Sequence, residues 1–201
     1  MGAGRVRLVL ASDNAGKLAE LKVLLEPLGV ELLPQRALGI EDAAETASTF
    51  VENALIKARH AAQATGLAAL ADDSGLVVPA LGGEPGIRSA RFSGHHRDDH
   101  ANNRLLLDRL AATDDRRAYF YCVLVLLRTA ADPAPLIATG TWWGEIAHAP
   151  RGDGGFGYDP LFVVAGTRLT AAELPPAEKH RTSHRGQAMR QLLDALGRAP
   201  L

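Results

Sequence analysis

The stretch RVRLVLASDNAGKLAELKVLLEPLGVELLP, residues 5–34, joins a strand pattern to a helix pattern and then to a second strand pattern. Residues 5–11 form a short, largely apolar run with β-branched side chains, a pattern that favours a strand. Leucines then recur at helical spacing from Leu18 to Leu28, and Gly29 ends the helix before VELLP. This succession predicts an α/β fold.

The rest of the chain also alternates between helix patterns and strand patterns. TFVENALIKARHAAQATG predicts an alanine-rich helix closed by Gly66, on which Asn53 and Lys57 are four residues apart and share a face. Strand patterns occupy 67–71, 76–78, 117–127 and 136–146, the last two as an antiparallel pair, and helix patterns occupy 101–112, 169–174 and 183–196. We therefore expect a twisted mixed sheet with flanking helices, in two lobes with a cleft between them.

Composition limits the class of protein. The 201 residues, 47% of them hydrophobic and 22% charged, fit one domain spanning 1–201, and no apolar run is long enough to cross a bilayer. We find no secretory signal, so the expected compartment is the cytoplasm. The net charge of −1 argues against a nucleic-acid-binding surface, and Cys122 lies in an apolar run typical of a buried thiol.

A polar turn follows the first strand and precedes the first helix. Backbone N–H groups and a lysine at a helix N-terminus attract phosphate, although an ordinary helix cap with a solvated lysine has the same pattern. The segment contains Ser12, Asp13, Asn14, Ala15, Gly16 and Lys17.

An acidic pair, Asp72 and Asp73, stands in LADDSGL at the end of an apolar strand pattern. Adjacent strand residues point in opposite directions, so the two carboxylates should not face one ligand. One of them can bind a hard cation while the other holds structure; a plain Asp-Asp-Ser-Gly turn is the alternative.

The loop GGFGYDPLF, residues 154–162, presents an aromatic side chain from a glycine-rich turn. Such a ring can stack on a nucleotide base, and it can equally serve as a hydrophobic plug. The candidates here are Phe156, Gly157, Tyr158 and Asp159.

Charged residues gather before the last helix, where Glu178, Lys179, His184 and Arg185 stand close in sequence. Cationic donors of this kind suit an anion or a purine edge, and a solvated helix start is the alternative. A second polar patch contains His95, His96 and His100 beside arginine and aspartate; this density of histidines resembles a metal site, but the sequence favours a solvated loop.

These segments, in order along nearly the whole chain, resemble the inosine and xanthosine triphosphate pyrophosphatase family. The resemblance implies an elongated two-lobed α/β fold with the nucleotide in a cleft, a magnesium ion and a homodimer. It also implies hydrolysis of non-standard purine triphosphates to the monophosphate and pyrophosphate, which keeps deaminated purines out of DNA and RNA. Membrane and nucleic-acid partners are not expected.

The resemblance also implies roles for single residues. Asp73 would be the catalytic base and a magnesium ligand, Glu45 a second acidic group near the metal, and Ser74 a substrate contact. Glu45 is followed by Thr-Ala, where the family usually has Thr-Gly. Residues 12–17, 156–159, Lys179, His184 and Arg185 would bind the nucleotide; from the shared helix face we add Asn53 and Lys57.

Two other functions fit many of the same residues. One is a house-cleaning pyrophosphatase for modified pyrimidine or methylated nucleotides, which would need a different base pocket. The other is a sensor that holds a nucleotide without cleaving it, against which the acidic Asp73 and Glu45 argue.

Overall fold

The computed structural model describes residues 7–25, 29–95 and 98–198. Its strands are β1 (Arg7–Leu10), β2 (Glu31–Pro34), β3 (Ala68–Val77), β4 (Arg117–Leu127), β5 (Leu136–Ile146) and β6 (Phe162–Val164). Its α-helices are α1 (Ala15–Leu25), α2 (Phe50–Thr65), α3 (Asp99–Arg109), α4 (Pro176–Thr182) and α5 (His184–Arg198). Short 3₁₀ helices cover Gln35–Leu38, Pro79–Leu81 and Gly86–Arg91.

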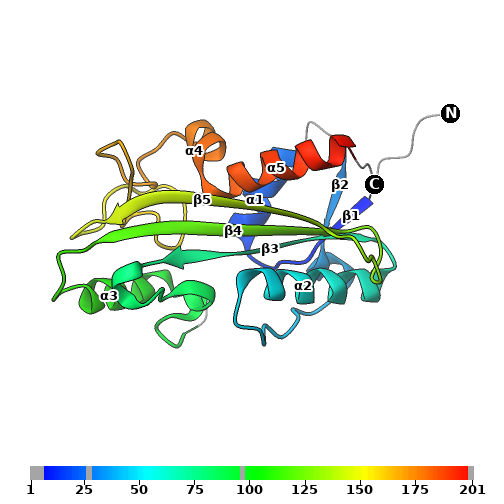
Figure 1. Cartoon of the computed structure of the whole chain (residues 1–201), viewed down its shortest axis with the longest axis horizontal. Helices are drawn as coiled ribbons and strands as arrows, with labels where there is room; N and C mark the ends of the chain where they lie inside the picture. The colour runs from blue at the N-terminus through cyan, green and yellow to red at the C-terminus, as the bar shows by residue number, and fades with distance from the viewer. Residues whose placement is uncertain (1–6, 26–28, 96–97, 199–201) are drawn as a thin grey trace. The chain divides into compact units, whose positions relative to one another are not determined.

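The strands form a six-stranded sheet in the order β2-β1-β3-β4-β5-β6 (Figure 1). β1 pairs in parallel with both β2 and β3, whereas β6 runs antiparallel to β5. The sheet is therefore mixed, and with its flanking helices it confirms the predicted α/β class.

The chain divides into two compact units. The first contains the described residues of 1–73, 123–139 and 186–201, and the second contains 74–122 and 140–185, of which 96–97 lie outside the description. The division falls within β3, β4 and β5, so these strands contribute residues to both units.

The first unit is built around the parallel strands β1 and β3. Figure 1 shows α2 on one side of these strands and α1 with α5 on the other. Helix α2 buries a face of small residues, including Ala54, Ala58 and Ala61, which permits close packing on the sheet. Thr49 caps its N-terminus by accepting a hydrogen bond from the Glu52 N–H, as a capping residue should.

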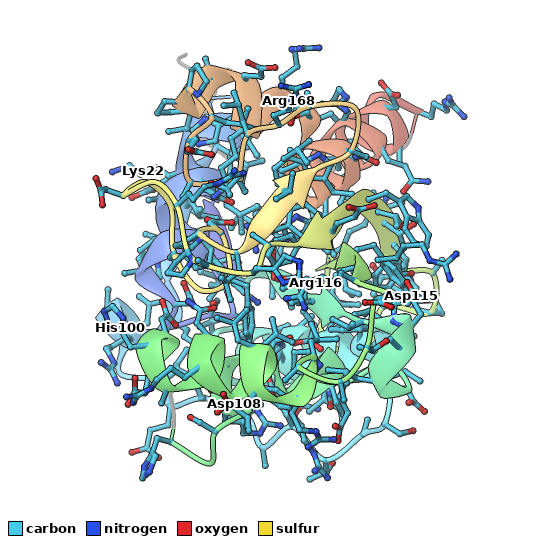
Figure 2. All side chains as sticks on the ribbon, turned by 90° about the vertical axis from the view of Figure 1, so that its left-hand side faces the viewer. Lys22, His100, Asp108, Asp115, Arg116 and Arg168 are labelled. Carbon is cyan, nitrogen blue, oxygen red and sulfur yellow. The ribbon has the colours of Figure 1, made fainter. Side chains whose placement is uncertain are left out.

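The second unit has an aromatic core. Phe120, Trp142 and Phe162 pack together with ring centroids 4.6–6.4 Å apart, and aliphatic residues of β3 and α3 complete the cluster. Figure 2 shows α3 in the foreground, with His100 and Asp108 along it. Together with β4 and β5, this core supports the loop that follows β5.

Two sequence-based expectations about the fold are wrong. DDSG was expected to interrupt the strand patterns, but β3 runs through it without a break, because the polar side chains of 72–74 find partners inside the protein. Residues 169–174 were expected to form a helix, but they form a turn. Thr170 forms a β-bridge with Val163, and the following Pro-Pro pair begins α4 instead.

Other boundaries agree closely with expectation. β4 and β5 have the predicted bounds, and α5 (His184–Arg198) begins one residue after the predicted start at 183 and ends two residues after the predicted end at 196. Cys122 is buried, as predicted. The short strand β6 was not anticipated, while Leu28 and His96 lie outside the described residues. Among the helices described, none has the length and apolar character needed to span a membrane.

Candidate active site

The segment after β1 forms the N-terminus of α1. The Asn14 side-chain oxygen accepts a hydrogen bond from the Lys17 N–H at 3.0 Å, and the Asn14 N–H donates to the Ser12 hydroxyl at 3.2 Å. Asn14 is thus a capping residue, and the segment is anchored as a turn. The exposed Arg36 guanidinium forms an ion pair with Asp13, with 3.2 Å between Arg36 Nε and Asp13 Oδ2.

Lys17 extends from α1 to the acidic pair in β3. Its ammonium lies 2.7 Å from the Asp72 carboxylate, with the lysine side chain 14% exposed and the aspartate side chain fully buried. Asp72 therefore neutralises Lys17 within the first unit. Asp72 is thus the member of the pair that holds structure, as the sequence predicts for one of the two.

Asp73 forms its ion pair with a lysine of α2 instead of α1. The Lys57 ammonium lies 2.6 Å from Asp73 Oδ1 and 3.1 Å from Glu45 Oε1, and it donates to the Asp72 carbonyl at 2.9 Å. Asp72 and Asp73 thus pair with lysines from different helices, as the alternation along a strand predicts. We call Glu45, Lys57 and Asp73 the acid–lysine group.

Burial gives the acid–lysine group unusual acid–base properties. Burial raises the pKa of Asp73 above its ordinary value, and the nearby charges of Lys57 and Lys17 offset this only in part. Burial alone would lower the pKa of Lys57, but Asp73 and Glu45 outweigh it and raise the pKa. Asp73 is therefore more basic than an ordinary carboxylate, and Lys57 stays protonated.

One oxygen of Asp73 is open to another partner. Oδ2 is buried and has no hydrogen-bond partner among the residues described. A buried carboxylate oxygen left in this state is costly, so a water molecule or a cation is its natural complement. Asp73 therefore has one oxygen fixed by Lys57 and one available for chemistry.

The donor set fits a hard cation held by few protein ligands. No group of three or more His, Cys, Asp or Glu side chains suited to a metal occurs in the described part of the chain. Magnesium is commonly held by one or two carboxylates together with substrate phosphates and water. Asp73 and Glu45, which contact the same lysine, supply carboxylate oxygens of this kind.

Asn53 holds the chain segment that carries Glu45. Its amide is fully buried, accepts from the Ala47 N–H at 3.0 Å and donates to the Ala47 carbonyl at 3.4 Å. Asn53 and Lys57 thus engage the same short segment, as their common helix face predicts. The observed contacts give Asn53 a supporting role, and substrate binding by Asn53 stays a prediction.

The glycine-rich loop of the second unit presents Phe156. Asp159 Oδ2 accepts a hydrogen bond from the Phe156 N–H at 2.8 Å and another from the Lys179 ammonium at 2.7 Å. Gly155 has φ +75°, and a Cβ there would overlap the Asp159 carboxylate. The loop is therefore tightly closed, and only glycine fits at this position.

Two cations stand over the Phe156 ring. The Lys179 ammonium lies 5.1 Å and the Arg185 guanidinium 5.9 Å from the ring centroid, which is cation–π distance. Arg185 is 2% exposed and donates to the Ser74 hydroxyl at 2.9 Å. We call Phe156, Lys179 and Arg185 the aromatic–cation group.

Two predicted nucleotide residues lie in the aromatic core. The His184 ring stacks on Phe120 with centroids 4.8 Å apart and an interplanar angle of 11°. Tyr158 is buried, its hydroxyl donates to the Ser89 carbonyl at 2.9 Å, and burial raises the pKa of its phenol. These contacts anchor the loop and the start of α5, so both residues at least support the site.

The remaining predicted residues are more peripheral. His95 and His100 are both exposed, as expected, but His100 lies on helix α3 and not in a loop. Sequence reasoning missed Asp99 and Asn103, whose side chains bind both backbone groups of Gly157. Their segment looks like an ordinary polar helix start, so no sequence pattern marks them.

Comparison with known proteins identifies the family. The chain belongs to the Ham1 family, which it matches over residues 8–195. It is 60% identical over 195 residues to a dITP/XTP pyrophosphatase from Aromatoleum aromaticum, covering 97% of this chain and 98% of that protein.

Solved structures of similar proteins share the fold. A Ham1 protein from Coxiella burnetii is 52% identical, with a TM-score of 0.89 over 96% of this chain and 100% of that one. A nucleoside-triphosphatase and dITP/XTP pyrophosphatase from Mycobacterium abscessus is 46% identical, with a TM-score of 0.75 over 98% of this chain and 100% of that one.

Proposed function

We propose that this chain hydrolyses the triphosphates of inosine, deoxyinosine and xanthosine to the nucleoside monophosphate and pyrophosphate. This reaction removes deaminated purines from the pool used for DNA and RNA synthesis. The observation that carries the proposal is Asp73, a buried carboxylate of raised pKa with one unbonded oxygen among the described residues. The relative at 60% identity is a dITP/XTP pyrophosphatase, which supports the choice of substrate.

Asp73 orients and deprotonates the attacking water. Lys57 fixes Oδ1 at 2.6 Å, which leaves Oδ2 to accept a hydrogen bond from a water molecule directed at the α-phosphorus. A carboxylate of ordinary pKa is a weak base at neutral pH, and burial moves Asp73 toward the required range.

Lysines reduce the repulsion between this carboxylate and the triphosphate. Lys17 and Lys57 each neutralise one aspartate of β3, so the substrate meets paired rather than unpaired negative charge. Lys57 directs its three donors at Asp73, Glu45 and the Asp72 carbonyl, so it acts on the triphosphate through its charge, whereas Lys17 directs two of its three donors at Asp72. We assign to both lysines the role of stabilising the negative charge that develops on the departing pyrophosphate.

The proposed metal is magnesium, held by Asp73 and Glu45. When bound, magnesium neutralises phosphate charge and lowers the pKa of a coordinated water. The Asn53 contacts with Ala47 keep the Glu45 segment in place for this role.

The aromatic–cation group is assigned to the base. The Phe156 ring offers a stacking surface, and the guanidinium and ammonium groups offer donors to the 6-keto oxygen of hypoxanthine or xanthine. Adenine carries an amino donor at that position, so it would leave these groups unpaired. A site built on such donors discriminates by a factor on the order of 10⁴.

The direct test is product analysis with the purified protein. With magnesium and inosine triphosphate, we expect one pyrophosphate per inosine monophosphate and no orthophosphate; adenosine triphosphate should react far more slowly. Preferred cleavage of a modified pyrimidine triphosphate would support the related house-cleaning function instead. Tight binding without cleavage would support a sensor.

We also propose a homodimer acting in the cytoplasm as a single domain over 1–201. This part rests on the family resemblance. Light scattering of the purified protein tests the dimer, for which twice the 21.3 kDa chain mass is expected. A monomer at micromolar concentration would contradict it.

A further inference from the structure

Three consecutive peptide groups around Phe156 are each held by a side chain. The Phe156 N–H donates to Asp159, the Gly157 N–H donates to Asp99 Oδ2 at 2.7 Å, and the Gly157 carbonyl accepts from Asn103 Nδ2 at 3.0 Å. The peptide planes on both sides of Phe156 are therefore fixed. Since only its own side-chain torsions remain, the ring has little freedom of placement.

Asp99 and Asn103 come from one face of α3. They are four residues apart, which places them one above the other on a helix. One provides an acceptor for an N–H and the other a donor for a C=O, so their chemistry matches the two backbone groups of Gly157. Gly157 has φ +64°, a conformation that L side chains rarely adopt and that these bonds hold in place.

The neighbouring Asp98 has a different task. Its carboxylate accepts from the Ala101 N–H at 2.9 Å and caps α3. Asp99 is therefore not needed as the cap, and its Oδ2 binds the loop residue Gly157, far away in sequence. Two adjacent aspartates thus separate the stability of the helix from the position of the loop.

Helix α3 is itself fixed at its middle and at its end. Asn102 accepts from the Ser93 N–H at 2.8 Å and donates to the Ser89 carbonyl at 3.4 Å. Arg116 donates to the Leu110 carbonyl at 3.4 Å and to the Ile146 carbonyl at 2.6 Å, which ties the helix end to β5. The helix is thus a rigid base from which Asp99 and Asn103 act.

We propose that Asp99 and Asn103 are positioning residues that preorganise Phe156 to stack on the purine base. This inference rests on the proposed function, in which Phe156 stacks on the base. A ring already held in its binding orientation loses less conformational freedom when the ligand arrives. The two residues therefore act on substrate affinity rather than on the hydrolytic step.

Kinetics with inosine triphosphate test the proposal. We expect Asp99→Ala and Asn103→Ala each to raise KM about tenfold, with kcat within about twofold of wild type. The double variant should be little worse than either single one, because both act on the same residue. Asp99→Asn retains a side-chain oxygen acceptor and should restore most of the affinity.

Asp98→Ala is the matched control. It should lower the melting temperature by removing the cap, and leave KM unchanged. An equal rise of KM in Asp98→Ala, or an unchanged KM in both Asp99→Ala and Asn103→Ala, would overturn the positioning role.

Hydrogen exchange separates this inference from the proposed function. In the full-length protein, Asp99→Ala should accelerate exchange of the 156–159 amides about tenfold or more, and Asp98→Ala should not. If wild type releases no pyrophosphate from inosine triphosphate, the proposed function fails, and base positioning fails with it even if the exchange result holds. If wild type is active but neither KM nor exchange responds to Asp99→Ala, only the inference fails.

Discussion

The acid–lysine group and the aromatic–cation group differ in what surrounds their buried cations. In the first, one lysine faces two carboxylates: the Lys57 ammonium lies 2.6 Å from Asp73 and 3.1 Å from Glu45. In the second, Lys179 and Arg185 stand over an aromatic ring, at 5.1 and 5.9 Å from its centroid. The first arrangement shifts proton affinity, and the second places two cations over an aromatic face.

This contrast predicts a division of labour. Substitutions in the acid–lysine group should lower kcat or change the free energy of unfolding, because they leave buried charges unpaired. Changes in the aromatic–cation group should weaken binding of the base, because stacking is present in both the ground state and the transition state. The following experiments test this division, from the largest expected effect to the smallest.

Asp73→Asn should lower kcat about a thousandfold or more, because the variant has no base to accept a proton from water. The steady-state rate of pyrophosphate release from inosine triphosphate measures this effect. Asp108→Asn, which alters an exposed carboxylate on α3, is the control and should have wild-type activity. A kcat within a few-fold of wild type for Asp73→Asn would remove Asp73 from the mechanism.

Lys57→Met should lower the free energy of unfolding by ~3 kcal/mol, because it leaves the buried Asp73 and the partly exposed Glu45 without their shared cation. Urea denaturation measures the change. The exposed Lys22→Met should shift it by no more than about 0.5 kcal/mol. Equal stability of the two variants would show that Lys57 does not hold the acid–lysine group together.

Phe156→Ala should raise KM for inosine triphosphate about tenfold and lower kcat much less, the loss expected for one stacked base. Trp143→Ala is the control, because it removes an exposed aromatic ring that contacts Tyr119 rather than the glycine-rich loop, and it should leave KM unchanged. A fall in kcat with unchanged KM for Phe156→Ala would contradict the assignment of this ring to the base.

The pH dependence of stability should reveal the raised pKa of Asp73. The folded protein binds this proton more tightly than the unfolded chain, whose pKa is near the ordinary 3.8. Stability associated with the protonated carboxyl is therefore present below that value and is lost as pH rises through the folded pKa. In metal-free buffer, the free energy of unfolding of wild type relative to Asp73→Asn should fall over this range; a rise would contradict the shift.

Sequence patterns predicted much of the fold. Strand patterns located β4 and β5, helical spacing located α5, and Gly66 marked the end of α2, because these signals are local. DDSG misled because a polar run normally marks a turn, whereas here its charges are neutralised by lysines from distant parts of the chain. Such long-range pairing has no local signature.

Only part of the site could be predicted from the sequence, for the same reason. The alternation of Asp72 and Asp73 followed from strand geometry, and the common face of Asn53 and Lys57 followed from helix geometry. The contact of Lys57 with Asp73 spans 16 residues, and that of Asp99 with Gly157 spans 58. These contacts arise from tertiary packing, so only the structure could show that Asn53 supports a loop or that α3 holds Gly157.

The most direct test of the central claim is hydrolysis of inosine triphosphate in water enriched in oxygen-18, with magnesium present. Attack of water on the α-phosphorus predicts one labelled oxygen in inosine monophosphate and none in pyrophosphate, as mass spectrometry of both products would show. Label in pyrophosphate, or release of labelled orthophosphate, would contradict the account.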